Sequence, residues 1–232
     1  MSRIAILLLV LAVHAATAVN GQTPERPRVF LLVIDDLHLD FRETPRTRAL
    51  LQQILGTLAK DGDVWSVVST GTSSLTLAPT TDLAAVRAAV RRMTGNALTT
   101  NTRLGVAAAA EHRRRAEVSY QTAADAISPI AAVPNRGALT VLYVSGGYDT
   151  RVAAPPSAVV EAATRVQARV IPIFTWPWWS PDPAAGVPFD KWQAYVAATQ
   201  DSLRTLATET SGFAVLTPSD LEPALRTIEP HP

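Results

Sequence analysis

The stretch VFLLVIDD at residues 29–36 decides the fold. Six consecutive apolar residues followed by two aspartates are typical of a central strand that is covered on both faces and ends at the edge of a sheet. Segments with strand-like composition recur along the chain, at 64–69, 139–144, 170–174 and 213–216. The sequence therefore predicts a sheet with a buried centre.

Segments with helical spacing separate these strands. Thr44 and Pro45 supply an N-cap and a proline at the first helical position, and apolar residues at helical spacing follow up to Leu58. Residues 74–77 are expected to return beside 64–69 as an antiparallel edge strand. Further helices are expected after Thr81 as a cap, over 102–131, over 156–165, before Gly212 and over 221–228. This alternation predicts an α/β fold with a doubly wound, mostly parallel central sheet, one antiparallel edge strand and helices on both faces.

The beginning of the chain has the three parts of a secretory signal peptide. Arg3 provides the charge, residues 4–13 form the apolar core, and residues 16–18 (Ala-Thr-Ala) offer an A-x-A cleavage site. A membrane anchor is the alternative, but a spanning helix needs about 20 apolar residues and this run is shorter. Export to the periplasm or the extracellular space is therefore expected. The predicted organisation is a signal peptide at 1–18, a flexible lead-in at 19–27 and a single domain at 28–229.

Charge and cysteine content exclude several classes of function. The 232 residues carry a formal net charge of +1 and include no cysteine. Nucleic-acid binding needs a basic excess that neutralises phosphates, so the balance argues against a nucleic-acid partner. Without cysteine there is no disulfide, thiolate nucleophile, zinc–thiolate site or iron–sulfur cluster. After the signal segment, no apolar run is long enough to span a bilayer.

Candidate chemistry lies where the predicted strands end, because ligands of doubly wound sheets bind beyond the carboxyl ends of the strands. Asp35, Asp36, His38 and Asp40 follow the first strand, and residues 145–149 (Ser-Gly-Gly-Tyr-Asp) follow the strand at 139–144. Three carboxylates and a histidine within six residues suit a hard cation such as Mg²⁺ or Ca²⁺. The alternative is that Asp35 caps the strand end and the other side chains are solvated.

Several local phrases, taken in order, resemble von Willebrand factor type A domains, and in particular the bacterial exported VWFA-related branch. They are FLLVIDDLH at 30–38, DGDVWSVVS at 61–69, TDL at 81–83, ALTVLYVSGGY at 138–148 and LATETSG at 206–212. The resemblance spans roughly residues 28–228. It implies a vWA/Rossmann-like fold and a role in binding another protein.

The resemblance also implies a metal-ion-dependent adhesion site, built from D-x-S-x-S after the first strand, a threonine from a middle loop and a later aspartate. Asp35 matches the first aspartate, but the two serine positions fall on Leu37 and Leu39, and the later aspartate falls on Gly146. Losing three of five oxygen donors predicts a degenerate site, because hard cations need several oxygens.

The threonine of that site has three candidates, Thr99, Thr100 and Thr102, of which Thr102 is favoured because Gly105 and a run of alanines follow it. A rebuilt metal site would use Asp35, Asp36, His38 and Thr102, with Mg²⁺ or Ca²⁺ as the ion.

An aromatic, proline-rich segment is the second feature of interest. Trp176, Trp178 and Trp179 follow the strand at 170–174. These rings either pack as a small satellite core or form a partner-binding surface, since exposed tryptophan and tyrosine are enriched in binding hot spots. The predicted partner-binding residues are Trp176, Trp178, Trp179, Tyr148 and Asp149. Trp192 and Tyr195 have helical spacing and are expected to be packed.

Together these features favour an exported, non-enzymatic protein-interaction module with a degenerate metal site. The alternative is a metal-dependent hydrolase that uses Asp35, Asp36 and His38. Such an enzyme needs more ligands and a nucleophile motif, whereas only three histidines follow the signal segment and no G-x-S-x-G motif occurs. A protein partner of unknown identity is expected, and Mg²⁺ or Ca²⁺ is the only cofactor that the sequence suggests.

Overall fold

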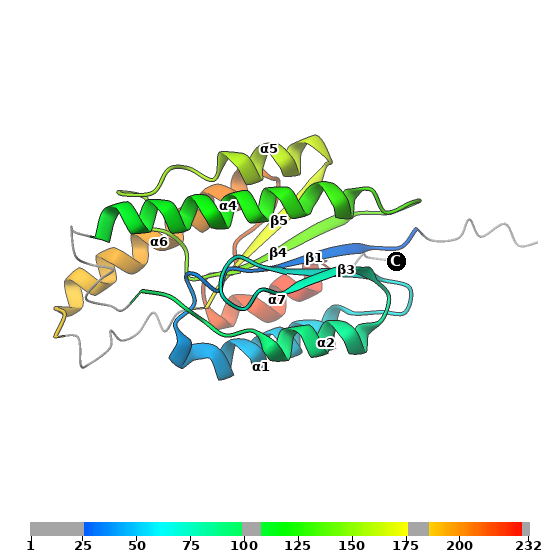
Figure 1. Ribbon diagram of the computed structural model, residues 1–232, viewed down its shortest axis with the longest axis horizontal. Coiled ribbons are helices and arrows are strands. Elements are labelled where there is room, and N and C mark those ends of the chain that lie inside the picture. Colours follow the sequence, from blue (N-terminus) through cyan, green and yellow to red (C-terminus); the bar gives the residue numbers. More distant parts are fainter. Residues whose placement is uncertain (1–25, 99–107, 176–185, 229–232) are drawn as a thin grey trace, which may run out of the picture.

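A five-stranded sheet between two layers of helices forms the molecule (Figure 1). The computed structural model describes residues 26–98, 108–175 and 186–228. The strands are β1 (Val29–Ile34), β2 (Val64–Ser69), β3 (Thr76–Thr80), β4 (Leu139–Ser145) and β5 (Ala168–Phe174), in the order β3-β2-β1-β4-β5. Only the β2–β3 pair is antiparallel among these strands. The fold class predicted from the sequence is confirmed.

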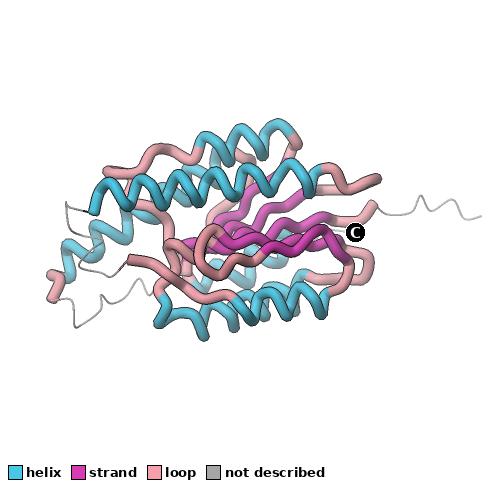
Figure 2. Tube along the Cα trace, viewed as in Figure 1, coloured by secondary structure: helices cyan, strands magenta, loops and turns pink. Residues whose placement is uncertain are grey.

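Helices cover both faces of the sheet, as Figure 2 shows. One layer consists of α4 (Ala109–Ala131), α5 (Ser157–Arg165) and α6 (Phe189–Glu209). The other layer consists of α1 (Thr44–Leu58), α2 (Leu83–Arg92) and α7 (Pro218–Ile228). A short 3₁₀ turn, η1 (Phe41–Glu43), precedes α1.

The continuous apolar run of β1 follows from its central position. Its side chains alternate between the two helical layers, because successive residues of a strand point to opposite faces. Val29, Leu31 and Val33 pack with α4, α5 and α6, whereas the intervening side chains pack with α1, α2 and α7. All six residues are buried, so both faces of β1 need apolar side chains. Trp192 and Tyr195 on α6 are also buried, as their helical spacing predicted.

Two local expectations are corrected. Helix α2 is capped by Asp82 and not by Thr81: the Asp82 carboxylate accepts hydrogen bonds from the amides of Ala84 and Ala85 at 2.9 and 3.1 Å. Helix α1 begins one residue earlier than expected, so Thr44 is its first residue and Glu43 takes the N-cap position without a side-chain hydrogen bond.

The strand predicted at 213–216 is reduced to a single parallel bridge between Ile173 and Val215. The Val215 amide donates to the Pro172 carbonyl at 2.9 Å. In a strand, the N–H and C=O groups of one residue point to the same side. The Pro172 carbonyl faces Val215, so the N–H group that proline lacks would have faced Val215 as well. The ladder outside β5 therefore cannot continue through this position.

No helix of the described ranges is long and apolar enough to cross a membrane. Several predicted features fall outside these ranges: the signal peptide at 1–18, most of the lead-in at 19–27, Thr102, and Trp176, Trp178 and Trp179.

Candidate functional site

Asp35 lies directly after the central strand β1, and its carboxylate is wholly buried. His38 Nδ1 is 3.0 Å from Oδ1, and the Thr70 hydroxyl donates to the same oxygen at 2.9 Å. The hydroxyls of Ser145 and Tyr148 donate to Oδ2 at 2.5 and 2.7 Å. Both carboxylate oxygens therefore have two hydrogen-bond partners each.

The parallel register of the sheet brings three of these residues together. Ile34 is paired with Ser69 of β2 and with Val144 of β4. The next residue along each strand is Asp35, Thr70 or Ser145, so their side chains meet at one edge. The strand ends are tied by the Asp35 amide, which donates to the Val144 carbonyl, and by the Thr70 amide, which donates to the Ile34 carbonyl.

Gly147 allows Tyr148 to turn back toward Asp35. Its φ is +70°, and a Cβ atom built there would lie 2.3 Å from the Thr199 carbonyl oxygen of α6. Only glycine combines this left-handed conformation with such a close approach. The turn is held by the Gly147 amide, which donates to the Ser145 hydroxyl, and by the Tyr148 amide, which donates to Ser202.

A chain of buried hydroxyls extends inward from Asp35. The Tyr148 hydroxyl is hydrogen-bonded to that of Tyr143, which in turn lies 2.9 Å from the Ser119 hydroxyl on α4. Burial raises the pKa of Tyr143 and Tyr148 well above the ordinary tyrosine value, and the Asp35 charge adds to the effect. Both phenols therefore stay protonated and are available as donors.

The electrostatic balance favours the ionised form of Asp35. Burial alone would raise the pKa of this carboxyl group. The electrostatic interaction with His38 and the hydrogen bonds from His38, Ser145 and Tyr148 outweigh burial, and they hold the Asp35 pKa below its ordinary value. His38 also packs edge-on against the Tyr148 ring, with the ring centroids 4.4 Å apart.

Asp36 lies beside this cluster and binds the β2–β3 loop with its other oxygen. It is wholly buried, and its Oδ2 accepts the Ser73 amide at 2.7 Å. Its Oδ1 lies 3.3 Å from the Thr70 hydroxyl, whose shorter hydrogen bond goes to Asp35. Of the predicted metal ligands, Asp35 and His38 are thus brought into direct contact, whereas Asp36 anchors a neighbouring loop.

These residues do not fit the adhesion-site metal that the sequence resemblance implies. A ligand oxygen must point a lone pair at the cation, and an ionised carboxylate has about four lone-pair positions. All four on Asp35 face donors of this chain. Leu37 and Leu39 are 8% and 1% exposed and have no oxygen to offer. Across 26–98, 108–175 and 186–228, no group of three or more histidine, aspartate or glutamate side chains is placed to hold a metal ion.

Tyr148 and Asp149 require a correction, because their predicted role as a partner-binding surface supposed exposed side chains. They are 3% and 8% exposed. Tyr148 belongs to the Asp35 cluster, and the Asp149 carboxylate accepts two hydrogen bonds from the Arg151 guanidinium, at 2.8 and 2.6 Å. The three tryptophans of the same prediction lie outside the described residues.

The sequence hypothesis missed the partners of Asp35. The signal for Thr70 and Ser145 was available, since each hydroxyl residue stands at the end of a predicted strand. Tyr143 lies inside a strand and Ser119 inside a helix, where a single polar residue gives no sign of its partner.

No protein-family model matches the chain, and no curated protein matches it. Among solved structures, the chain is similar to a von Willebrand factor type A protein from Catenulispora acidiphila, with 18% identity, a TM-score of 0.44 and coverage of 88% of this chain. It spans 42% of the length of that protein. It is also similar to an uncharacterized membrane spanning protein from Vibrio fischeri, with 14% identity and a TM-score of 0.26, over 88% of this chain and 96% of the other. At these identities and TM-scores, neither similarity assigns the chain to a family.

Proposed function

We propose that this chain is an exported, non-enzymatic protein-interaction module of the von Willebrand factor type A kind, with a degenerate metal-ion-dependent adhesion site. The ordered sequence phrases between residues 30 and 212 support the family, and the doubly wound sheet with one antiparallel edge strand agrees with it. The observation that carries the proposal is the saturated carboxylate of Asp35.

Asp35 stands where the resemblance expects the first metal ligand, yet its partners are groups of the same chain. For a cation to bind, His38 and three hydroxyls would have to leave, and their polar atoms would be left buried without an acceptor. The His38 ring occupies one side of the carboxylate instead, with its Nδ1 atom 3.0 Å from Oδ1. In this proposal Asp35 joins the strand ends and does not bind a ligand.

The arrangement of hydroxyls supports a non-enzymatic role. A serine nucleophile needs a base within hydrogen-bond reach and access to substrate. Ser145 is wholly buried and donates to Asp35, and the Nδ1 atom of His38 faces the same carboxylate and not a hydroxyl. The hydrolase alternative needs Asp35, Asp36 and His38 to face one cation, whereas Asp36 faces the Ser73 amide.

Export and the class of partner are supported by the sequence. The charged start, short apolar core and A-x-A exit at 1–18 support secretion to the periplasm or the extracellular space. A net charge of +1 favours a protein partner over nucleic acid.

Affinity capture from the cell envelope, with and without EDTA, tests this proposal. The same protein partner is expected in both conditions, because no metal mediates the contact. Isothermal titration with Mg²⁺, Ca²⁺ and Mn²⁺ at millimolar concentration is expected to give no saturable heat. Saturable binding that disappears in Asp35→Ala but persists in Asp201→Ala, a change at an exposed carboxylate, would show a working metal site.

A further inference from the structure

A cavity of about 230 Å³ lies between α4, α6 and the loop that joins β4 to α5. Its wall is formed by Tyr120 and Tyr148, by residues 153–156 (Ala-Ala-Pro-Pro) of the loop, and by Ser202 and Thr205 of α6. In the described part of the chain, no charged side chain lines it. Because an apolar cavity of about 150 Å³ is large enough for benzene, this one is large enough for a substituted ring.

Most hydroxyl groups in this wall already have a partner. The Tyr148 hydroxyl donates to the Asp35 carboxylate at 2.7 Å. The Ser202 and Thr205 hydroxyls donate to carbonyl groups of their own helix, at 2.7 and 3.0 Å. Thr150 is exposed, so water satisfies its hydroxyl. None of these groups needs a partner from the cavity.

The loop in the wall is also poor in backbone donors. Pro155 and Pro156 have no N–H group, and the Ala153 amide donates to the Asp149 carbonyl at 3.0 Å. The two prolines also fix φ, which makes this part of the wall stiff. The loop therefore offers a preformed, mainly apolar surface to a ligand.

Tyr120 differs from the other hydroxyl residues of the wall. It is 5% exposed, and its ring packs against that of Tyr148 with the centroids 4.6 Å apart. Its hydroxyl makes no hydrogen bond within 26–98, 108–175 and 186–228. The enclosed polar atoms that lack a partner in these ranges do not include this oxygen, so it keeps access to the space that Tyr120 lines. Burial and the charge of Asp35 raise the Tyr120 pKa well above the ordinary tyrosine value, so the hydroxyl keeps its proton and can donate it.

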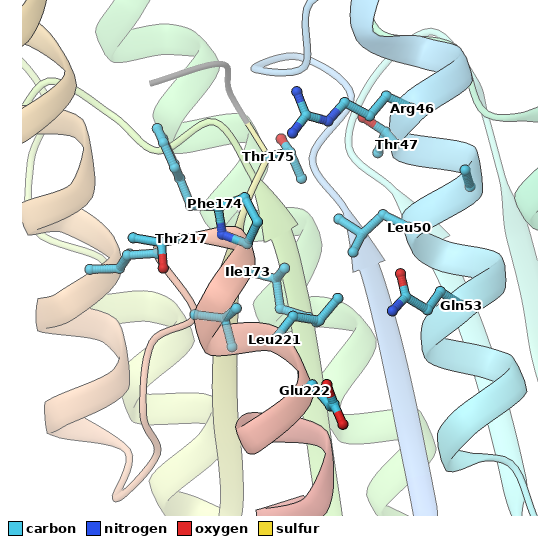
Figure 3. A pocket seen from close by; sticks show the side chains of 14 residues that line it. Arg46, Thr47, Leu50, Gln53, Ile173, Phe174, Thr175, Thr217, Leu221 and Glu222 are labelled. Atoms are coloured by element: carbon cyan, nitrogen blue, oxygen red, sulfur yellow. The ribbon is translucent and has the colours of Figure 1, made fainter. Parts of the chain in front are cut away.

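A larger cavity, of about 380 Å³, lies between α1, α7 and the carboxyl end of β5 (Figure 3). Its buried threonines, Thr47 and Thr175, keep their hydroxyl oxygens enclosed in the wall, out of contact with the cavity. The Arg46 guanidinium in its wall lies 4.0 Å from the Glu43 carboxylate. Of these two cavities, the smaller one is therefore the one in which a described donor is buried, unpaired and open to the ligand space.

We propose that the cavity beside Tyr120 binds a small, neutral aromatic molecule that carries one hydrogen-bond acceptor. The Tyr120 hydroxyl donates to the acceptor, and the ring of the ligand packs against the two tyrosines and the two prolines of the wall. A charged ligand is disfavoured, because its charge would be buried without an opposite charge in the wall. The site is separate from the proposed protein contact and does not depend on it.

NMR titration of the full chain with acetophenone and ethylbenzene tests the proposal. The two probes have similar shapes, but only acetophenone has an acceptor oxygen. Both are expected to bind saturably. Tyr120→Phe is expected to weaken acetophenone binding about three- to tenfold, because a hydrogen bond is lost, and to leave ethylbenzene binding unchanged or tighter. Tyr195→Phe, a change at a buried tyrosine outside the wall, is the matched control and is expected to preserve the affinities of both probes.

A second pair of variants tests the location of the site. Thr205 and Thr227 both donate to the carbonyl four residues earlier, but only Thr205 belongs to the wall. Thr205→Phe is expected to fill the cavity and to abolish the binding of both probes, whereas Thr227→Phe is expected to bind them as the parent chain does. Benzoate, which has the shape of acetophenone and a negative charge, is expected to bind at least tenfold more weakly than acetophenone.

Thermal unfolding of Tyr120→Phe gives an independent measurement. Its melting temperature is expected to match or exceed that of the parent chain, because the hydroxyl that is removed has no partner in the chain. A clear drop would mean that the hydroxyl is satisfied within the chain, and this would overturn the proposal. The proposal also fails if acetophenone does not bind at millimolar concentration, if benzoate binds as tightly as acetophenone, if Tyr120→Phe changes the affinities of acetophenone and ethylbenzene equally, or if binding persists in Thr205→Phe.

Discussion

The Asp35 carboxylate connects three strand ends, because its partners follow β1, β2 and β4. Such a residue is hard to replace, since each donor loses its acceptor when the carboxylate is removed. A buried acceptor that satisfies several donors contributes to stability mainly through the cost of leaving those donors unpaired. The role of Asp35 is therefore tested most directly by unfolding measurements.

Asp35→Ala is expected to lower the free energy of unfolding by about 3–5 kcal/mol, because His38 and three buried hydroxyls lose the carboxylate that accepts their hydrogen bonds. Denaturation in urea measures the change. Asp201→Ala serves as the control: this carboxylate is 59% exposed, and its removal is expected to matter by less than about 0.5 kcal/mol. A loss of under about 1 kcal/mol in Asp35→Ala would contradict the role of this residue as a joint between strands.

Stability is also expected to fall in acid. The pKa of Asp35 is held below its ordinary value in the folded chain, so the unfolded chain binds a proton more readily. The stabilisation from this carboxylate is therefore complete at pH values above its pKa in the unfolded chain, which is about 3.8. It is lost as the pH falls through its lower pKa in the folded chain. Unfolding in urea between pH 7 and pH 2 measures the loss, which is expected to be smaller in Asp35→Asn.

Glu111 provides the comparison for this acid effect. Hydrogen bonds from Arg114 and Arg115 lower its pKa to about 2, but it lies on the helix surface, where ion pairs contribute little. Glu111→Gln is thus expected to leave most of the acid sensitivity in place. If Asp35→Asn retained the full acid loss while Glu111→Gln removed it, the assignment to Asp35 would be wrong.

At the scale of elements, the turn after β4 fixes the position of Tyr148 against α6. Gly147→Ala is expected to cost about 2–4 kcal/mol, since the added methyl group meets the Thr199 carbonyl and alanine disfavours positive φ. Gly62→Ala is a matched control, because Gly62 has a φ of +87° but open space around its Cβ position. Urea denaturation of both variants separates the cost of the clash with Thr199 from the cost of placing alanine at positive φ. Equal losses in the free energy of unfolding would contradict the close approach of Gly147 to α6.

The elements also show how far the sequence was informative. Strand β1 was predictable because a strand covered on both faces must be apolar at every position. The reduction of the strand at 213–216 to a single bridge was not predictable. The apolar residues of this segment are typical of a strand, whether or not the edge of β5 has the free N–H and C=O groups that a further strand needs. The missing N–H group of Pro172 limits the pairing of this segment with β5. Pro172 lies some forty residues before Val215 in the sequence, so the segment itself gives no sign of the effect.

The candidate site was also predictable only in part. A pair of aspartates directly after a central strand was visible in the sequence, and the first of them, Asp35, is the centre of the cluster. Its partners Thr70 and Ser145 are 35 and 110 residues away, so only the register between strands brings them together. Leu37 and Leu39 predicted that few oxygens would follow Asp35 along the chain, but not which groups would surround its carboxylate.

At the scale of the whole molecule, the sheet separates two apolar layers. Ile54 of α1 and Ile127 of α4 belong to different layers. Ile54→Val and Ile127→Val are each expected to cost about 0.5–1.5 kcal/mol, and the double variant is expected to lose their sum. A double-mutant cycle in urea checks this, and a coupling above about 1 kcal/mol would mean that the layers are not independent.

Both outer strands of the sheet contain a proline, Pro79 in β3 and Pro172 in β5. A proline has no amide hydrogen, so neither edge presents an unbroken row of donors to the strand of another molecule. Strands interrupted in this way are less able to pair edge to edge with other copies of the chain. We expect Pro79→Ala/Pro172→Ala to scatter more light on mild heating than the parent chain, through sheets that grow edge to edge.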